Sequence, residues 1–169
     1  MGDLRACVLG AGMLGEVHAE SWTKVPGVTV VAVADPLAER VEKLAAKVGA
    51  QAYTDWREAL AEAAADVVSV AVPSGYHREC AVAALERGCH VLCEKPLAVS
   101  LEDALAIQAA AEASDRKFGV AFCKRFLGQV EKVTELVQSG VLGRPLLYRH
   151  VSAIERRFKL WIMDRQLGG

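Results

Sequence analysis

The stretch RACVLGAGMLG, residues 5–15, decides the fold of this 169-residue chain. A short apolar run leads directly into Gly10-x-Gly12-x-x-Gly15, and a helical pattern follows. In such a turn the first glycine permits a tight bend, the second lets a pyrophosphate approach the backbone, and the third lets helix and strand pack closely. Anionic oxygens then meet unpaired N–H groups at the helix N-terminus. The pattern predicts a dinucleotide-binding turn; an ordinary glycine-containing turn is the alternative.

A second apolar run, VTVVAVA at residues 28–34, ends at Asp35, twenty residues beyond Gly15. An acidic residue at this distance is expected to accept hydrogen bonds from the ribose hydroxyls of a dinucleotide. The carboxylate would repel the 2′-phosphate of NADP, so the sequence favours NAD. Arg40 lies nearby in the sequence and keeps NADP open as the alternative cofactor.

The bulk composition, 53% hydrophobic and 24% charged residues, is typical of a soluble globular protein. A formal net charge of −1 argues against a nucleic-acid partner, which normally requires a basic excess. No apolar run approaches the roughly 18 residues of a membrane span. The first residues also lack the order of segments found in a secretory signal, so we expect a cytoplasmic protein without a membrane partner.

The five cysteines are an odd number spread through apolar segments, which predicts buried, reduced thiols. The run CHVLC at 89–93 offers zinc ligands as an alternative. On a strand, however, Cys89 and Cys93 face one way and His90 the other, so these side chains cannot easily share one ion. We therefore expect no metal site.

Strands and helices alternate along the chain. The predicted strands are 5–9, 28–34, 52–53, 66–72, 90–93 and 118–122. One predicted helix follows the glycine turn, and the others are 36–48, 54–64, 76–87, 101–114 and 126–139. This alternation predicts right-handed crossovers and an α/β fold, a doubly wound parallel Rossmann sheet in the order 3-2-1-4-5-6. Residues 146–154 have the pattern of a strand of a different kind.

Helix boundaries are predicted from capping residues. Pro36 suits the first turn of the second helix and Gly49 its end. Thr54 is the expected N-cap of the third helix. Ser100, with Asp103 three residues later, is the expected cap of the helix that follows it.

Five further features of the sequence are informative together. They are GAGMLG with His18 three residues beyond it, Asp35-Pro36, the loop VPSGYH at 72–77, Glu94-Lys95-Pro96-Leu97, and Lys124-Arg125-Phe126. Together they resemble the glucose-fructose oxidoreductase, inositol dehydrogenase and rhizopine-catabolism family, known as Gfo/Idh/MocA. The segment around the fourth feature, GCHVLCEKPLAVSLEDA at residues 88–104, is the most specific part of the resemblance.

The resemblance implies an NAD(P)-dependent oxidoreductase that acts on a secondary alcohol of a sugar, an inositol or a related polyol, with Lys95 as a catalytic residue. It further implies substrate-side positions for His18 and Arg125, and a homo-oligomer for the complete family fold. The implied cofactor-binding residues are Gly10, Ala11, Gly12, Met13, Leu14, Gly15, Asp35, Pro73, Ser74, His77, Glu94 and Lys95.

Several of these side chains have simpler interpretations. Lys95 follows a central strand, where open α/β sheets bind ligands, but it could equally be a surface lysine paired with Glu94. His77 could be a helix-terminal histidine that bonds only to its neighbours. For His18 a packing role is the alternative, and for Arg125 an exposed surface position.

The predicted domains are a dinucleotide-binding domain over 1–123, and a connecting helix with the start of an incomplete α+β domain over 124–169. In the family that the sequence resembles, an aspartate and a histidine of a D-x-x-x-H motif in the second domain complete the active site. These 169 residues contain no such motif. The alternative function is therefore a non-catalytic dinucleotide-binding module, a sensor or scaffold.

Overall fold

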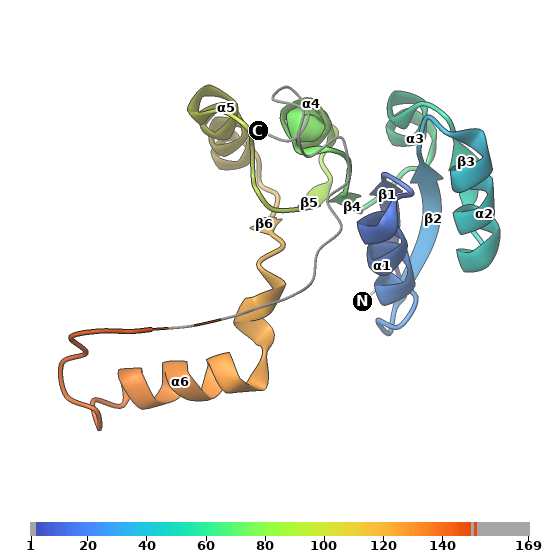
Figure 1. Ribbon diagram of the computed structural model, residues 1–169. Coiled ribbons are helices and arrows are strands. Elements are labelled where there is room, and N and C mark those ends of the chain that lie inside the picture. Colours follow the sequence, from blue (N-terminus) through green and yellow to red (C-terminus); the bar gives the residue numbers. More distant parts are fainter. Residues whose placement is uncertain (1–2, 150, 152–169) are drawn as a thin grey trace. The chain divides into compact units, whose positions relative to one another are not determined.

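Six parallel strands form one sheet in the computed structural model, which describes residues 3–149 and 151. The strands are β1 (Leu4–Leu9), β2 (Val28–Ala34), β3 (Gln51–Tyr53), β4 (Val67–Val70), β5 (His90–Cys93) and β6 (Phe118–Val120). Their order is β3-β2-β1-β4-β5-β6, which Figure 1 shows from right to left. The predicted doubly wound order is confirmed.

Helices cover both faces of this sheet. They are α1 (Met13–Trp22), α2 (Ala38–Val48), α3 (Trp56–Glu62), α4 (His77–Glu86) and α5 (Leu101–Ala113). One apolar cluster joins α1 and α2 to the sheet through Val8 and Val33. A larger cluster joins α3, α4 and α5 to the other face through Leu9, Val70 and Cys93. The side chains of Val8 and Leu9, neighbours in β1, thus pack into the apolar clusters on opposite faces of the sheet, because successive side chains of a strand alternate between its faces.

The strand register brings the carboxyl ends of the central strands to one level. Leu9 of β1 pairs with Ala34 of β2 and with Val70 of β4, and Val70 pairs with Cys93 of β5. The residue that follows each strand therefore lies at the same sheet edge. After β1 the chain proceeds toward β2 and β3, and after β4 it proceeds toward β5 and β6. A ligand crevice is expected where these directions diverge, between β1 and β4.

Two capping predictions are confirmed and two are wrong. Gly49 ends α2 with a φ of 71°, and Ser100 accepts a hydrogen bond from the Asp103 backbone at the start of α5. The N-cap of α3 is Asp55 rather than Thr54, because the Asp55 carboxylate accepts a hydrogen bond from the backbone N–H of Arg57. Pro36 precedes α2, which begins at Ala38.

The strand predicted over 146–154 is not found in its described part. Residues 146–149 and 151 have no strand structure, whereas 150 and 152–154 lie outside the described residues. Leu146 and Leu147 are almost fully exposed. A strand exists only where another strand pairs with it, and a local alternation of residue types supplies no pairing partner.

Residues 3–121 form one compact unit, and 122–149 with 151 belong to a second. The second unit holds the short 3-10 turn η2 (Cys123–Phe126) and the helix α6 (Gly128–Gln138). The predicted domain boundary at residue 124 stays a prediction. Within the described residues, no helix is long and apolar enough to cross a membrane.

Candidate cofactor and active site

The glycine turn between β1 and α1 depends on the absence of side chains at two positions. Gly10 has a φ of +101°, and a Cβ atom there would lie 2.5 Å from the backbone oxygen of Ala71. A Cβ on Gly15 would lie 1.8 Å from the Gly10 carbonyl oxygen. These two glycines are therefore required for the chain to fold into this turn.

Gly12 has a different environment. A Cβ atom built on it would meet nothing within 4 Å, and its φ of −76° is open to any residue. Gly12 is also the N-cap of α1 and provides no side-chain hydrogen bond to the helix. Because first-turn N–H groups have no acceptor within a helix, those of Met13 and Leu14 are free to bind a ligand. This open space in front of helix amides fits the pyrophosphate of a dinucleotide.

Asp35 follows β2 and lies beside the glycine turn. Its Oδ2 accepts a hydrogen bond of 2.8 Å from the backbone N–H of Ala11, and its Oδ1 accepts one of 3.0 Å from Leu37. The carboxylate is half-buried and faces the same sheet edge as Gly12. It can hold ribose hydroxyls while it keeps the turn in place.

The loop after β4 contains Pro73, Ser74 and His77, and Ser74 begins the short 3-10 turn η1 (Ser74–Tyr76). His77 is only 1% exposed and begins α4. Its Nε2 lies 3.0 Å from the carbonyl oxygen of Val72, and its Nδ1 lies 3.0 Å from that of Pro96. The ring thus lies between the loops after β4 and β5, and a neutral ring, with one N–H, can donate to one of these carbonyl oxygens.

The pKa of His77 is lowered from its ordinary value of 6.5, chiefly because burial disfavours the charged ring. The carbonyl oxygens of Val72, Leu97 and Pro96 act in the opposite direction, as does Glu94. Burial outweighs them, so the neutral ring is favoured in the folded protein.

Glu94 and Lys95 follow β5 at the same sheet edge. Glu94 is buried, with 7% of its surface exposed, and Lys95 is exposed. Glu94 Oε1 lies 3.1 Å from Nε2 of His18, and Oε2 accepts a hydrogen bond of 3.1 Å from the backbone N–H of Lys95. The Glu94 carboxylate is therefore engaged by these two groups and is not paired with the Lys95 ammonium, which leaves that ammonium available to a ligand.

The comparison with known proteins agrees with this geometry. A family model described as "Oxidoreductase family, NAD-binding Rossmann fold" matches residues 4–122. The chain belongs to the Gfo/Idh/MocA family.

Relatives within the Gfo/Idh/MocA family include inositol dehydrogenases. The chain is 37% identical to inositol 2-dehydrogenase 4 of Saccharopolyspora erythraea over 89% of this chain and 47% of the relative. It is 32% identical to scyllo-inositol 2-dehydrogenase (NAD(+)) of Bacillus subtilis, over 87% and 44% of the two chains. The chain thus spans about half the length of the curated relatives it matches.

Solved structures of the family share this fold. Scyllo-inositol dehydrogenase from Lactobacillus casei, with bound NAD(H) and scyllo-inositol, superimposes with a TM-score of 0.79 at 26% identity. The match covers 83% of this chain and 42% of that protein. The NAD-binding half of the Gfo/Idh/MocA fold is therefore present in residues 3–121.

The two predicted substrate-side residues belong to different units of the chain: His18 is buried in the first, and Arg125 is exposed in the second. His18 lies on α1, is 9% exposed, and bonds through both ring nitrogens to Ser69 and Glu94. Arg125 lies in the second unit, where its guanidinium is 5.3 Å from the centre of the Phe122 ring. Their substrate-side roles stay predictions.

Sequence reasoning missed Ser69 and Trp22 as partners of the site. Ser69 on β4 is fully buried, and its hydroxyl accepts a hydrogen bond of 2.8 Å from Trp22 Nε1 on α1. A signal was present, because Ser69 is the single polar residue inside the otherwise apolar run VVSVAV at residues 67–72. A lone hydroxyl within a central strand needs a hydrogen-bond partner.

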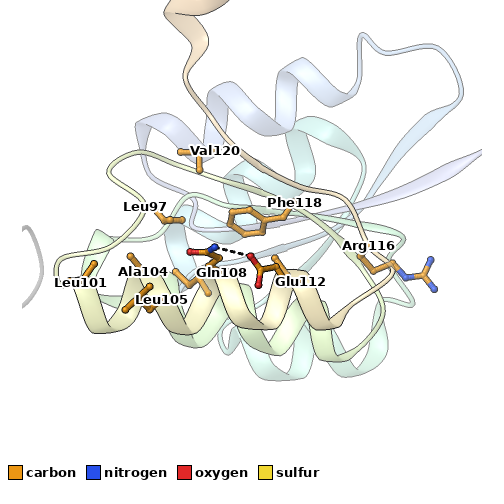
Figure 2. A pocket seen from close by; sticks show the side chains of 11 residues that line it. Leu97, Leu101, Ala104, Leu105, Gln108, Glu112, Arg116, Phe118 and Val120 are labelled. Carbon is orange, nitrogen blue, oxygen red and sulfur yellow. Dashed lines mark hydrogen bonds between the residues drawn. The ribbon is translucent and has the colours of Figure 1, made fainter.

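A groove of about 550 Å³ lies along α5 and β6, and Leu97 is one of the residues that line it. Figure 2 shows leucine side chains of α5 along it, with Gln108 donating a 2.7 Å hydrogen bond to Glu112. None of the predicted cofactor-binding or substrate-side residues lines this groove.

The cysteines provide no metal site in the described part of the chain. Cys89 and Cys93 are buried beneath α4 and α5, while His90 Nδ1 accepts a hydrogen bond from the Lys117 backbone. Burial raises the pKa of the Cys7 and Cys93 thiols to about 12. Among the described residues, no three His, Cys, Asp or Glu side chains are grouped as a metal ion would need.

Proposed function

We propose that this chain forms the NAD-binding half of a dehydrogenase that oxidises a secondary alcohol of an inositol, a sugar or a related polyol. The supporting observation is the sheet edge that has an open glycine turn, a half-buried carboxylate beside that turn, and a lysine whose ammonium forms no ion pair with the described residues. Gly12, Asp35 and Lys95 occupy these three positions. The family relationship and the names of the relatives support the same class of reaction.

Each group has a defined task in this proposal. NAD, when bound, would supply the hydride acceptor of the reaction. The N-terminal amides of α1 would hold its pyrophosphate, and Asp35 would accept hydrogen bonds from its adenosine ribose. Lys95 would hold the substrate oxygen with its ammonium or, as the neutral amine, accept the hydroxyl proton that is released when the hydride leaves. Glu94 fixes the backbone of Lys95 through its hydrogen bond to the amide.

The experiment combines binding and turnover. NADH is titrated against the chain by fluorescence, and NAD reduction by the complete gene product is followed with a panel of inositols and aldoses. Lys95→Met should leave the NADH dissociation constant within about twofold and abolish turnover, because the lysine acts on the substrate. Lys117→Met, at the opposite end of the sheet, is the matched control and should change neither.

Undiminished turnover in Lys95→Met would remove the lysine from the mechanism. NADH binding without turnover on any polyol would favour the alternative function, a non-catalytic dinucleotide-binding module.

A further inference from the structure

A continuous line of hydrogen bonds crosses the protein from α1 to the end of β5. It begins at Trp22 Nε1, which lies 2.8 Å from the Ser69 hydroxyl oxygen. That oxygen lies 3.1 Å from His18 Nδ1, and His18 Nε2 lies 3.1 Å from Glu94 Oε1. Glu94 Oε2 then accepts the backbone N–H of Lys95 at 3.1 Å. The side chains of Trp22, Ser69, His18 and Glu94 thus form one chain of hydrogen bonds, and its last member, Glu94, contacts the backbone N–H of Lys95.

The chemistry of the four side chains indicates which atom donates each hydrogen bond along this line. The indole nitrogen of Trp22 can only donate, so the Ser69 oxygen accepts there. The single hydroxyl hydrogen of Ser69 is then available to His18 Nδ1, which accepts it when that nitrogen carries no hydrogen. The neutral ring of His18 therefore has its hydrogen on Nε2 and donates it to the Glu94 carboxylate. A doubly protonated ring would leave the Ser69 hydroxyl hydrogen without an acceptor among the described residues.

Burial makes the His18 contact important to Glu94. Glu94 is 7% exposed and His18 is 9% exposed, so water provides little alternative solvation. A buried carboxylate that loses a hydrogen-bond donor bears a large desolvation penalty. Without the His18 donor we expect the Glu94 side chain to turn toward solvent, and its second oxygen then leaves the Lys95 amide.

We propose that His18 is a positioning residue for Lys95 and acts through the Glu94 carboxylate. Because His18 lies on the helix that begins at the glycine turn, the same helix that presents amides to the cofactor also orients the loop that carries the lysine. The consequence for catalysis rests on the proposed dehydrogenase function. The structural link between His18 and the Lys95 amide does not depend on that function.

The first test is spectroscopic and uses the unmodified, ¹⁵N-labelled chain. Long-range ¹H–¹⁵N correlation spectra of the imidazole rings should show His18 as the neutral tautomer with hydrogen on Nε2. A hydrogen on Nδ1 would overturn the proposed direction of the line. This measurement needs neither cofactor nor turnover.

The second test compares His18→Leu with His18→Gln. The leucine variant has no donor for Glu94, so exchange of the Lys95 amide hydrogen should become about tenfold faster. The amide nitrogen of glutamine can occupy the place of Nε2, and His18→Gln should restore slow exchange. His90→Leu is the matched control: it should speed exchange at Lys117, whose N–H His90 accepts, and leave Lys95 unchanged.

The third test separates positioning from cofactor binding. In His18→Leu we expect kcat to fall about tenfold or more, with the NADH dissociation constant nearly unchanged and partial recovery in His18→Gln. Unchanged Lys95 exchange in a folded His18→Leu variant would refute the proposal. The kinetic comparison uses the complete gene product; if that protein shows no polyol-dependent NAD reduction, the proposed function fails, and the tautomer and exchange measurements on the chain still decide the role of His18.

Discussion

The Asp35 carboxylate accepts a 2.8 Å hydrogen bond from the backbone N–H of Ala11, so the end of β2 is bonded directly to the glycine turn. A carboxylate offers about four lone-pair positions. Two of them are used by Ala11 and Leu37. The remaining positions can serve a ribose, so one side chain supports the turn and has acceptor positions left for a ligand.

Asp35→Ala and Asp35→Asn separate these two tasks. The alanine variant loses both, and we expect NADH binding to weaken about tenfold to a hundredfold, since hydrogen bonds to charged groups contribute about 1.5–3 kcal/mol. NADPH binding should weaken less, because the repulsion of its 2′-phosphate is removed as well. Asparagine keeps one oxygen acceptor and should give an intermediate NADH affinity. Equal losses for the two nucleotides, measured by titration calorimetry, would refute the ribose assignment.

Gly12 and Gly15 provide a matched pair of substitutions. Gly15→Ala should lower the free energy of unfolding by about 1–3 kcal/mol or more, because its Cβ would overlap the Gly10 carbonyl. Gly12→Ala should leave stability nearly unchanged, since no atom lies within 4 Å of the added methyl. It should instead weaken NADH binding, because the methyl fills the space predicted for the pyrophosphate. Thermal unfolding and NADH titration of both variants check this, and a stable Gly15→Ala chain would contradict the packing.

The cysteine thiols should differ sharply in reactivity. Cys7, Cys80, Cys89 and Cys93 are buried, and burial raises the pKa of each, whereas Cys123 is exposed. Because the thiolate is the reactive form, a disulfide reagent added to the folded chain should modify one thiol rapidly. All five should react after denaturation. Rapid modification of a second thiol in the folded state would contradict the described core.

His77 should make stability depend on pH. Its pKa is lower in the folded protein than in the unfolded chain, so the unfolded chain binds more protons between the folded pKa and about 6.5. The contribution of His77 is complete above pH 6.5 and is lost as the pH falls toward the folded pKa. The slope from one such group is at most about 1.4 kcal/mol per pH unit.

His77→Gln removes this titration and should flatten the profile of unfolding free energy below pH 6.5. Denaturant unfolding at several pH values between 5.5 and 7.5 measures the difference between the variant and the unmodified chain. A profile of the same slope in the variant would contradict a pKa of His77 that folding lowers.

The sheet and its cofactor edge could be predicted from the sequence because their signals are local. The glycine spacing, the acidic residue after β2 and the alternation of strands with helices each depend on neighbouring residues. Gly10 and Gly15 are needed for the reasons predicted, and Asp35 lies beside the turn. The functional roles of Lys95, His18 and Arg125, and the oligomer that the resemblance implies, stay predictions.

The side-chain partners could not be predicted in the same way. His18 and Glu94 are 76 positions apart in the sequence and meet only because α1 packs on the central strands β1, β2 and β4, next to the end of β5. The choice of Asp55 over Thr54 as a cap depends on the local backbone angles. The strand predicted at 146–154 lacks a pairing partner in the described chain, and no local pattern reveals that.

The most direct measurement is a titration of the ¹⁵N-labelled chain with NADH, followed by amide chemical shifts. The account predicts that the amides of Gly12, Met13 and Leu14 shift together with those near Asp35 and Lys95. Shifts confined to the α5 groove around Gln108, or no saturable shifts at all, would contradict the central claim that the glycine turn binds the cofactor.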